Sequence, residues 1–206
     1  MAQPQTKPLT FETFEDFIEW ERLQPTRHEL VDGVPVAMAG AGEAHNIIQG
    51  NIFAAAHAKL RSSPCVPFTS DMAMKTGVRK GRYPDITIDC GNRNPKNQSS
   101  PKPTVAIEVL SPETQKEDRT VKLAEYNSVP SIVHYVLVEQ SEPLVHVYSR
   151  GPSGDFLFRP QEIKGLDGTI ELPAVGISMA MAEVYERLNF DAGLGDDAEP
   201  PTGRPW

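Results

Sequence analysis

The segment TVAIEVLSPETQKEDRTVKLAEYNSVPSIVHYVLV, residues 104–138, decides the fold of this chain. It opens and closes with apolar runs rich in β-branched residues, which are typical of strands. Between them, Ser111-Pro112 is a helix-start signal, because a hydroxyl caps the first turn and a proline occupies its first position. Pro130 then forbids continuation of the helix. Two strands joined in this way pair in parallel through a right-handed crossover.

Further elements are predicted on both sides of this unit. Upstream, Asp32-Gly33 between apolar runs is a hairpin signal, and Pro35 places the second hairpin strand at a sheet edge. A helix capped by Thr10 or Thr13 precedes the hairpin. The elements predicted from their periodicity are helices over 10–23 and 43–61, extended segments over 65–76, 82–90 and 104–110, strands over 132–138, 144–148 and 156–158, and a short helix over 181–188.

This order predicts an α/β fold, with a core of one helix, three strands, a second helix and another strand around a mixed sheet. A helix and a β-hairpin precede the core, and additional strands follow it. With 206 residues, the chain is long enough for one sizeable domain. We therefore expect a polar tail over 1–9, a single domain over 10–188, and an acidic, Gly/Pro-rich tail over 189–206.

The composition is that of an ordinary globular protein, with 39% hydrophobic and 23% charged residues. The N-terminus lacks the basic and then apolar profile of a signal peptide, and no apolar run approaches the roughly 20 residues of a membrane span. Cys65 and Cys90 are too few and too unpatterned for a disulfide framework or a zinc site. These features predict a cytoplasmic protein with no membrane partner.

Charge is distributed unevenly along the chain. The net charge of −8 argues mildly against tight, non-specific binding of nucleic acid. Residues 75–102 nevertheless carry seven basic and two acidic side chains. Either these basic residues belong to a solvated surface loop, or some of them contact phosphates. The candidates for phosphate contacts are Lys75, Arg79, Lys80 and Arg82.

Glu108 lies in the apolar run VAIEVL, residues 105–110. A carboxylate buried in such a strand loses hydration worth several kcal/mol unless a cation, a metal or strong donors compensate. Asp85 follows Pro84 at the start of YPDITID, and both carboxylates can converge if the two strands are neighbours. One or two carboxylates, with waters and substrate phosphates, typically hold Mg²⁺. Alternatively, Asp85 is a turn-adjacent cap and Glu108 forms a buried salt bridge.

Lys122 is the predicted third member of this site. Its helix runs back along the sheet from the end of the Glu108 strand, and Lys122 lies roughly 15 Å along the helix axis. Glu108 lies about 7 Å back from the same end of the strand. Helical side chains lean toward the N-terminus, which brings the ammonium group toward Glu108. The alternative is a solvated lysine that pairs with Asp118 on its own helix.

Five features occur in this order: HELVDG, a histidine that opens a helix, YPDITI, VAIEVLSPET and DRTVKLAEYNSVPSIVHYVLV. The series resembles the Uma-two family of restriction endonucleases, within the PD-(D/E)XK nuclease superfamily. The resemblance covers about residues 11–188. It implies a restriction-endonuclease-like core whose acidic residues bind Mg²⁺, or Mn²⁺, and hydrolyse phosphodiester bonds of DNA.

By this resemblance, Asp85 and Glu108 correspond to the two acids of the superfamily, and the Val109 carbonyl is an additional metal ligand. The superfamily pattern places its lysine two positions after Glu108, where this chain has Leu110. Lys122 matches the position from which similar proteins supply that lysine. The departure puts catalytic competence, but not the metal site, in question.

Three further positions match the family. Glu29 is implied as a catalytic acid and as a ligand for a second metal ion. His45 is implied as an accessory residue, although a histidine near a helix N-terminus also serves as a cap or a packing residue. Tyr126 lies one turn beyond Lys122, and we expect it to position this lysine rather than to react.

Two functions from different classes follow. The first is a metal-dependent DNA endonuclease in which Lys122 orients the attacking water or stabilises charge on the phosphate oxygens. The second is a nuclease-fold module that has lost cleavage and binds nucleic acid or a protein partner. An enzyme that cuts both strands would use a homodimer, and the strands after Val138 are predicted to pair across it.

Overall fold

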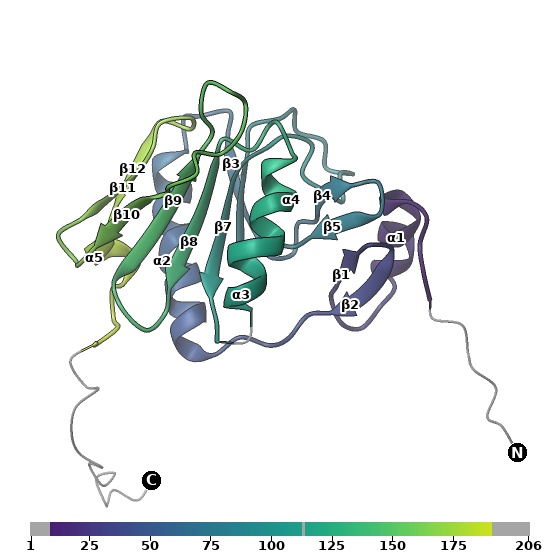
Figure 1. Ribbon diagram of the computed structural model, residues 1–206, viewed down its shortest axis with the longest axis horizontal. Coiled ribbons are helices and arrows are strands. Elements are labelled where there is room, and N and C mark those ends of the chain that lie inside the picture. Colours follow the sequence, from purple (N-terminus) through teal and green to yellow (C-terminus); the bar gives the residue numbers. More distant parts are fainter. Residues whose placement is uncertain (1–8, 113, 191–206) are drawn as a thin grey trace, which may run out of the picture.

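The computed structural model describes residues 9–112 and 114–190. Its centre is a six-stranded sheet with the strand order β10-β9-β8-β7-β6-β3. Helix α2, Glu43–Lys59, covers one face, and the crossover helix between β7 and β8 covers the other (Figure 1). The six strands are β3 Val66–Thr69, β6 Ile86–Asp89, β7 Pro103–Leu110, β8 His134–Glu139, β9 Leu144–Ser149 and β10 Gln161–Lys164. The predicted α/β class with a mixed sheet is confirmed.

Strand β7 is the central strand of the fold. All eight of its residues are buried, and burial on both faces explains why its sequence is apolar without alternation. It pairs in parallel with β8, with Glu108 opposite Leu137. It pairs antiparallel with β6, with Ile107 opposite Ile86. The parallel connection predicted for residues 104–138 is therefore confirmed.

The crossover helix consists of three consecutive segments: α3 Gln115–Glu117, a π-helical turn Asp118–Lys122, and α4 Leu123–Asn127. The predicted start at Pro112 is wrong, because this proline lies in a turn before the helix. Ser111 caps that turn, since its Oγ accepts a hydrogen bond from the Thr114 N–H at 3.2 Å. The π-helical turn is a local widening that the sequence analysis did not predict.

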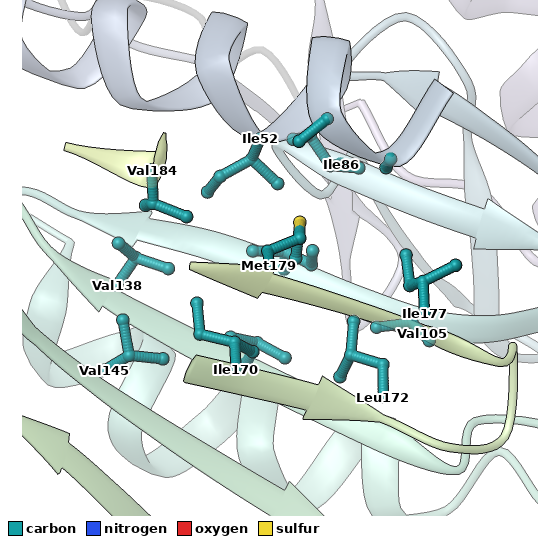
Figure 2. Packing of buried hydrophobic residues seen from close by; sticks show 14 of the residues in the cluster. Ile52, Ile86, Val105, Val138, Val145, Ile170, Leu172, Ile177, Met179 and Val184 are labelled. Carbon is teal, nitrogen blue, oxygen red and sulfur yellow. The ribbon is translucent and has the colours of Figure 1, made fainter. Parts of the chain in front are cut away.

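A small two-stranded sheet of β11, Thr169–Leu172, and β12, Ile177–Ala180, packs on the α2 face together with helix α5, Met181–Val184. Figure 2 shows Ile170 and Met179 of these strands packed among Ile52, Val138 and Val145. The β11–β12 hairpin and α2 together cover the face of the six-stranded sheet opposite to the crossover helix.

The C-terminal half differs in part from the prediction. The predicted strand over 156–158 is wrong, because only an isolated bridge joins Arg150 and Phe156 there. Strands β10, β11 and β12 were not predicted, and α5 is shorter than the predicted helix over 181–188. The parts of the predicted tails over 1–8 and 191–206 lie outside the described residues.

The N-terminal part forms a four-stranded sheet with the order β2-β1-β5-β4. Asp32 and Gly33 both have positive φ values, 48° and 87°, as a tight hairpin turn requires. Pro35 lies on β2 at the sheet edge, and Thr13 caps α1, so these predictions are confirmed. The elements of this part are α1 Phe14–Glu21, β1 His28–Val31, β2 Val34–Ala37, β4 Met74–Gly77 and β5 Lys80–Arg82.

Cys65 and Cys90 form a disulfide. They flank the first cross-strand pair of β3 and β6, Val66 with Asp89, so antiparallel pairing brings the two thiols together. The sequence analysis gave these cysteines no structural role, and that interpretation is corrected here. Within the described ranges, no helix is long and apolar enough to cross a membrane.

Candidate metal centre

A cleft of about 790 Å³ opens at the end of the six-stranded sheet where β7 finishes and β6 begins. Its lining includes residues of β1 and β2, of the connector between β2 and α2 with the start of α2, of the facing ends of β6 and β7, and of the crossover helix. The predicted site residues that line it are Glu29, His45, Asp85, Glu108, Val109 and Lys122. Antiparallel and parallel pairing around β7 therefore gathers residues that are far apart in the sequence.

Asp85 and Glu108 meet at this cleft because Ile86 and Ile107, their neighbours in sequence, are opposite each other across β6 and β7. The Asp85 N–H lies 3.4 Å from Glu108 Oε2. Asp85 Oδ2 accepts a hydrogen bond from the Val109 N–H at 2.7 Å. The convergence that the sequence analysis expected for these two acids is present.

Two residues of α2 hold Asp85 from the other side. His45 Nε2 lies 3.1 Å from Asp85 Oδ2, and the Gln49 amide donates to the Asp85 carbonyl at 2.8 Å. His45 and Gln49 are four residues apart and therefore share one face of the helix. The sequence analysis named His45 but missed Gln49, although this spacing was a usable signal.

The Glu108 carboxyl group is buried, with 3% of the residue exposed. Its Oε1 accepts hydrogen bonds from Lys122 Nζ at 3.1 Å and from the Tyr126 hydroxyl at 2.7 Å. Lys122 Nζ also lies 2.9 Å from Asp118 Oδ1 and 3.7 Å from Glu29 Oε1. Lys122 therefore contacts Glu108 across the site, as predicted, and Asp118 on its own helix, but it is buried rather than solvated as the alternative required.

Burial shifts the acid–base properties of these groups. Burial, together with the nearby carboxylates of Asp85, Asp118 and Glu29, raises the pKa of Glu108 to about 8, although Lys122 acts in the opposite direction. Burial alone would lower the pKa of Lys122, but the surrounding carboxylates raise it above its ordinary value. Apart from Lys122, the charged groups that act on Glu108 are the carboxylates of Asp85, Asp118 and Glu29, so negative charge is in excess there and an additional cation is electrostatically favoured.

Arg82 organises a second cluster behind the cleft. It is fully buried, and its guanidinium binds Glu29 and Glu117 at 2.7 Å each and Glu125 at 2.8 Å. Glu29 also lies 3.4 Å from the Tyr83 N–H, so donors face both of its oxygens. Arg82 has no exposed surface for a phosphate, and we do not keep it among the proposed phosphate contacts. This network was not predicted, because its members come from distant segments of the chain.

The other predicted phosphate contacts do not line the cleft. Each has an internal partner: Lys75 pairs with Glu15 at 2.6 Å, Arg79 donates to the Phe11 carbonyl at 3.2 Å, and Lys80 pairs with Asp32 at 3.1 Å and Glu125 at 3.3 Å. Lys75, Arg79 and Lys80 remain partly exposed, and their contact with phosphates stays a prediction.

The chemistry of the donor set fits Mg²⁺ or Mn²⁺. The described residues contain no group of three or more His, Cys, Asp or Glu side chains arranged to hold a metal ion. Two carboxylates with a backbone carbonyl and waters are instead sufficient for Mg²⁺. The excess of negative charge around Glu108 supports the same conclusion.

A mixed sheet that brings an aspartate and a glutamate from adjacent strands to one cleft, with a lysine against the glutamate, defines a restriction-endonuclease-like nuclease fold. The chain belongs to the Uma2 family, described as "Putative restriction endonuclease", whose model matches residues 14–182. A solved structure from Anabaena variabilis, described as "a putative nuclease belonging to DUF820", has the same fold. It matches with a TM-score of 0.66 at 15% identity and covers 84% of this chain and 97% of that chain.

Two proteins of Synechocystis sp. are also similar to this chain. "Uncharacterized protein slr1290" is 28% identical over 178 residues, which cover 85% of this chain and 92% of that protein. "Uncharacterized protein sll1609" is 23% identical over 163 residues, which cover 77% of this chain and 91% of that protein. The similarity in both cases spans nearly the whole relative, although neither name states a function.

Proposed function

We propose that this protein is a metal-dependent endonuclease that hydrolyses phosphodiester bonds of DNA. The observation that carries the proposal is the contact of Lys122 with Glu108 at 3.1 Å, directly beside Asp85 in an open cleft. Membership of a family described as restriction endonucleases supports the same chemistry.

Asp85 and Glu108, with the Val109 carbonyl, would hold Mg²⁺ or Mn²⁺. A bound ion would polarise the phosphate and lower the pKa of a water molecule. His45 and Gln49 restrict the Asp85 side chain and backbone, respectively, so that this ligand is preorganised. Tyr126 and Lys122 both donate to Glu108 Oε1. The other oxygen of this carboxyl group, Oε2, therefore faces Asp85.

Lys122 would stabilise negative charge on the phosphate oxygens or orient the attacking water. Its ammonium group is held by three carboxylates, and its raised pKa keeps it protonated at neutral pH. Glu29 contributes one of these contacts. Because donors already face both Glu29 oxygens, its geometry supports positioning of Lys122 more directly than ligation of a second ion.

The rival function, a binding module without cleavage, was suggested by the absence of a lysine two residues after Glu108. Leu110 at that position is buried in β7 and cannot contribute. Lys122 nevertheless brings an ammonium group to Glu108 from the crossover helix. This replacement of the missing side chain favours an enzyme over a degenerate module.

The proposal is tested by incubating the protein with supercoiled and linear DNA in Mg²⁺ or Mn²⁺, beside Asp85→Ala. Glu171→Ala, exposed on β11, is a matched control for loss of an acidic side chain. We expect cleavage by the wild type and the control, and none by Asp85→Ala. Thermal unfolding gives a second readout, since Mg²⁺ should raise the melting temperature of the wild type but not of Asp85→Ala. Intact DNA in both metals with every protein would refute the proposal.

A further inference from the structure

The lining of the cleft is acidic. Lys122 is the only lysine or arginine among the described residues that line it, and its ammonium group is already held between carboxylates. The acids in the lining are Glu29, Asp85, Glu108 and Glu117. Proteins that bind a duplex neutralise phosphates of both strands with rows of lysine and arginine. The described lining provides no such row.

The basic segment 75–102 does not provide one either. Strands β6 and β7 are antiparallel, so the pair of Asp89 with Pro103 marks the end of the sheet opposite to the cleft. Three of the seven basic residues, Arg93, Lys96 and Lys102, belong to the loop that joins β6 to β7 at that far end. Of the other four, Arg82 is fully buried, and Lys75, Arg79 and Lys80 lie outside the cleft lining with internal partners, so none of the seven faces a strand held at the carboxylates.

The remaining wall of the cleft is uncharged. It includes the connector between β2 and α2, residues 38–42, which has the sequence MAGAG, and a turn that begins at Ser111. In Figure 1 the connector passes the ends of β7 and α3 on its way from β2 to α2. A Cβ added to Gly40 or Gly42 would have nothing within 4 Å, so this wall has free space beside it.

We propose that the cleft takes single-stranded DNA, with one phosphate at the carboxylates and the neighbouring unpaired bases against residues 38–42. The inference rests on the proposed nuclease function and names its substrate class. Because the bases of a single strand are unpaired and can be splayed out, one phosphate can reach the metal ligands while its other phosphates stay in solvent. The cleft volume of about 790 Å³ is that of a pocket enclosing a small ligand, which suits a few unpaired nucleotides.

The test compares one labelled oligonucleotide as a single strand and annealed to its complement, in Mg²⁺ and in Mn²⁺. We expect the single strand to be cut at least about tenfold faster than the duplex. Binding is measured separately by fluorescence anisotropy with Ca²⁺ in place of Mg²⁺. The logarithm of the binding constant should fall with the logarithm of the salt concentration with a slope shallower than about −2, because few phosphates are contacted.

The outcomes separate this inference from the proposed function. Equal or faster cleavage of the duplex overturns the single-strand inference and leaves the nuclease function standing. If neither substrate is cut in either metal, the nuclease function fails. The anisotropy measurement then decides by itself whether the cleft prefers a single strand or a duplex. Tighter binding of the single strand then supports the inference, and equal or tighter binding of the duplex overturns it.

A variant of the uncharged wall gives an independent check. Gly40→Leu should raise KM for the single strand several-fold with little change in kcat, because it fills the space proposed for a base. The thermal shift caused by Mg²⁺ should be unchanged, since the metal ligands are untouched. Gly50→Leu is the matched control, because Gly50 is exposed on α2, does not line the cleft and also has open space beside it. An unchanged KM in Gly40→Leu would contradict the proposed position of the strand.

Discussion

At the scale of single residues, we propose for Lys122 a role on the substrate beyond the compensation of buried acids. Its ammonium group contacts the one Glu108 oxygen that also accepts from Tyr126. Three carboxylates hold the ammonium group in place, so the side chain reaches the cleft in a fixed position.

Lys122→Met should therefore reduce DNA cleavage by about 10²- to 10³-fold, the usual effect of removing one group that stabilises the charge of a transition state. The thermal shift caused by Mg²⁺ should persist, because both metal ligands remain. Lys59→Met, which removes an exposed lysine paired with Glu183, is the control. If Lys122→Met cleaves DNA at the wild-type rate, the assigned role of Lys122 is wrong.

His134, at the start of β8, should make stability depend on pH. Its Nε2 lies 3.4 Å from the Ala174 N–H and its Nδ1 lies 2.9 Å from Ser149 Oγ, so the ring is neutral with the proton on Nδ1. Burial lowers the pKa of His134 below its ordinary value of 6.5. The unfolded chain therefore takes up a proton at a higher pH than the folded chain does, and stability falls as pH decreases through 6.5.

Melting temperatures between neutral and mildly acidic pH test this expectation. The decline should be shallower in His134→Gln, whose amide cannot be protonated in this range. Parallel curves for His134→Gln and the wild type would show that the histidine does not contribute.

The sequence predicted the central residues of the site because each one breaks a local pattern. Glu108 interrupts an apolar strand, and Asp85 follows a proline at a strand start. The partners that hold them could not be predicted in the same way. His45 is 40 residues from Asp85, and Arg82 is 53 residues from Glu29, so only the folded chain reveals these contacts.

At the scale of elements, the π-helical turn Asp118–Lys122 allows residues 118, 122 and 126 to be buried together on the side of the sheet. An α-helix rotates by about 100° per residue, so residues at successive four-residue spacings drift around it. One wider turn offsets this drift. Wide turns of this kind are frequent at functional sites.

Deletion of Thr120, an exposed residue of this turn, should convert it to regular α-helix and move Lys122 relative to Glu108. We expect cleavage to fall by at least about 10²-fold, because small misplacements of catalytic groups have effects of this size. Circular dichroism should show that the helix is retained. Thr120→Ala, which keeps the length of the turn, should remain active. Full activity after the deletion would show that the π-helical turn is dispensable.

The disulfide joins Cys65 and Cys90, which are 25 residues apart in the sequence and flank β3 and β6. A covalent loop of this size should stabilise the fold by about 3 kcal/mol, mainly by restricting the unfolded chain. The double variant Cys65→Ala/Cys90→Ala and the wild type in reductant should therefore unfold at similarly reduced denaturant concentrations. Reductant should have no effect on the double variant. Equal unfolding midpoints with and without reductant in the wild type would contradict this contribution.

Elements with a sustained pattern or a turn signal were predicted, and several short strands without such a signal were not. The helix over 43–61 and the parallel connection around 104–138 are confirmed, because each shows a sustained pattern. Strands β4, β5 and β10 to β12 have only three or four residues each. Such segments are too short to show alternation, and their pairing depends on contacts made elsewhere in the fold.

At the scale of the whole molecule, the strands after Val138 find partners within the chain. β9 pairs with β8 and with β10, and β11 pairs with β12. Among the described strands after Val138, the edges left for the predicted pairing across a homodimer are those of β10, the last strand of the six-stranded sheet, and of β11 and β12.

A homodimer stays a prediction, and it is tested in solution. Light scattering should give about twice the mass of the 22.7 kDa chain. A monomer at every concentration would exclude the dimer and would remove the simplest route to cutting both strands of a duplex. It would remain compatible with cleavage of a single strand.

Arg82 connects parts of the protein that lie far apart in the sequence. Its carboxylate partners belong to β1, α3 and α4, while Arg82 itself is on β5. These acids come from the four-stranded sheet and from the crossover helix that packs on the six-stranded sheet. We expect the two parts to fold cooperatively, since separating them would leave several buried charges unpaired. Lys122, which shares Glu29 with this cluster, reaches its position only when both halves have assembled. We therefore expect that a nascent or partly unfolded chain does not form the proposed metal centre.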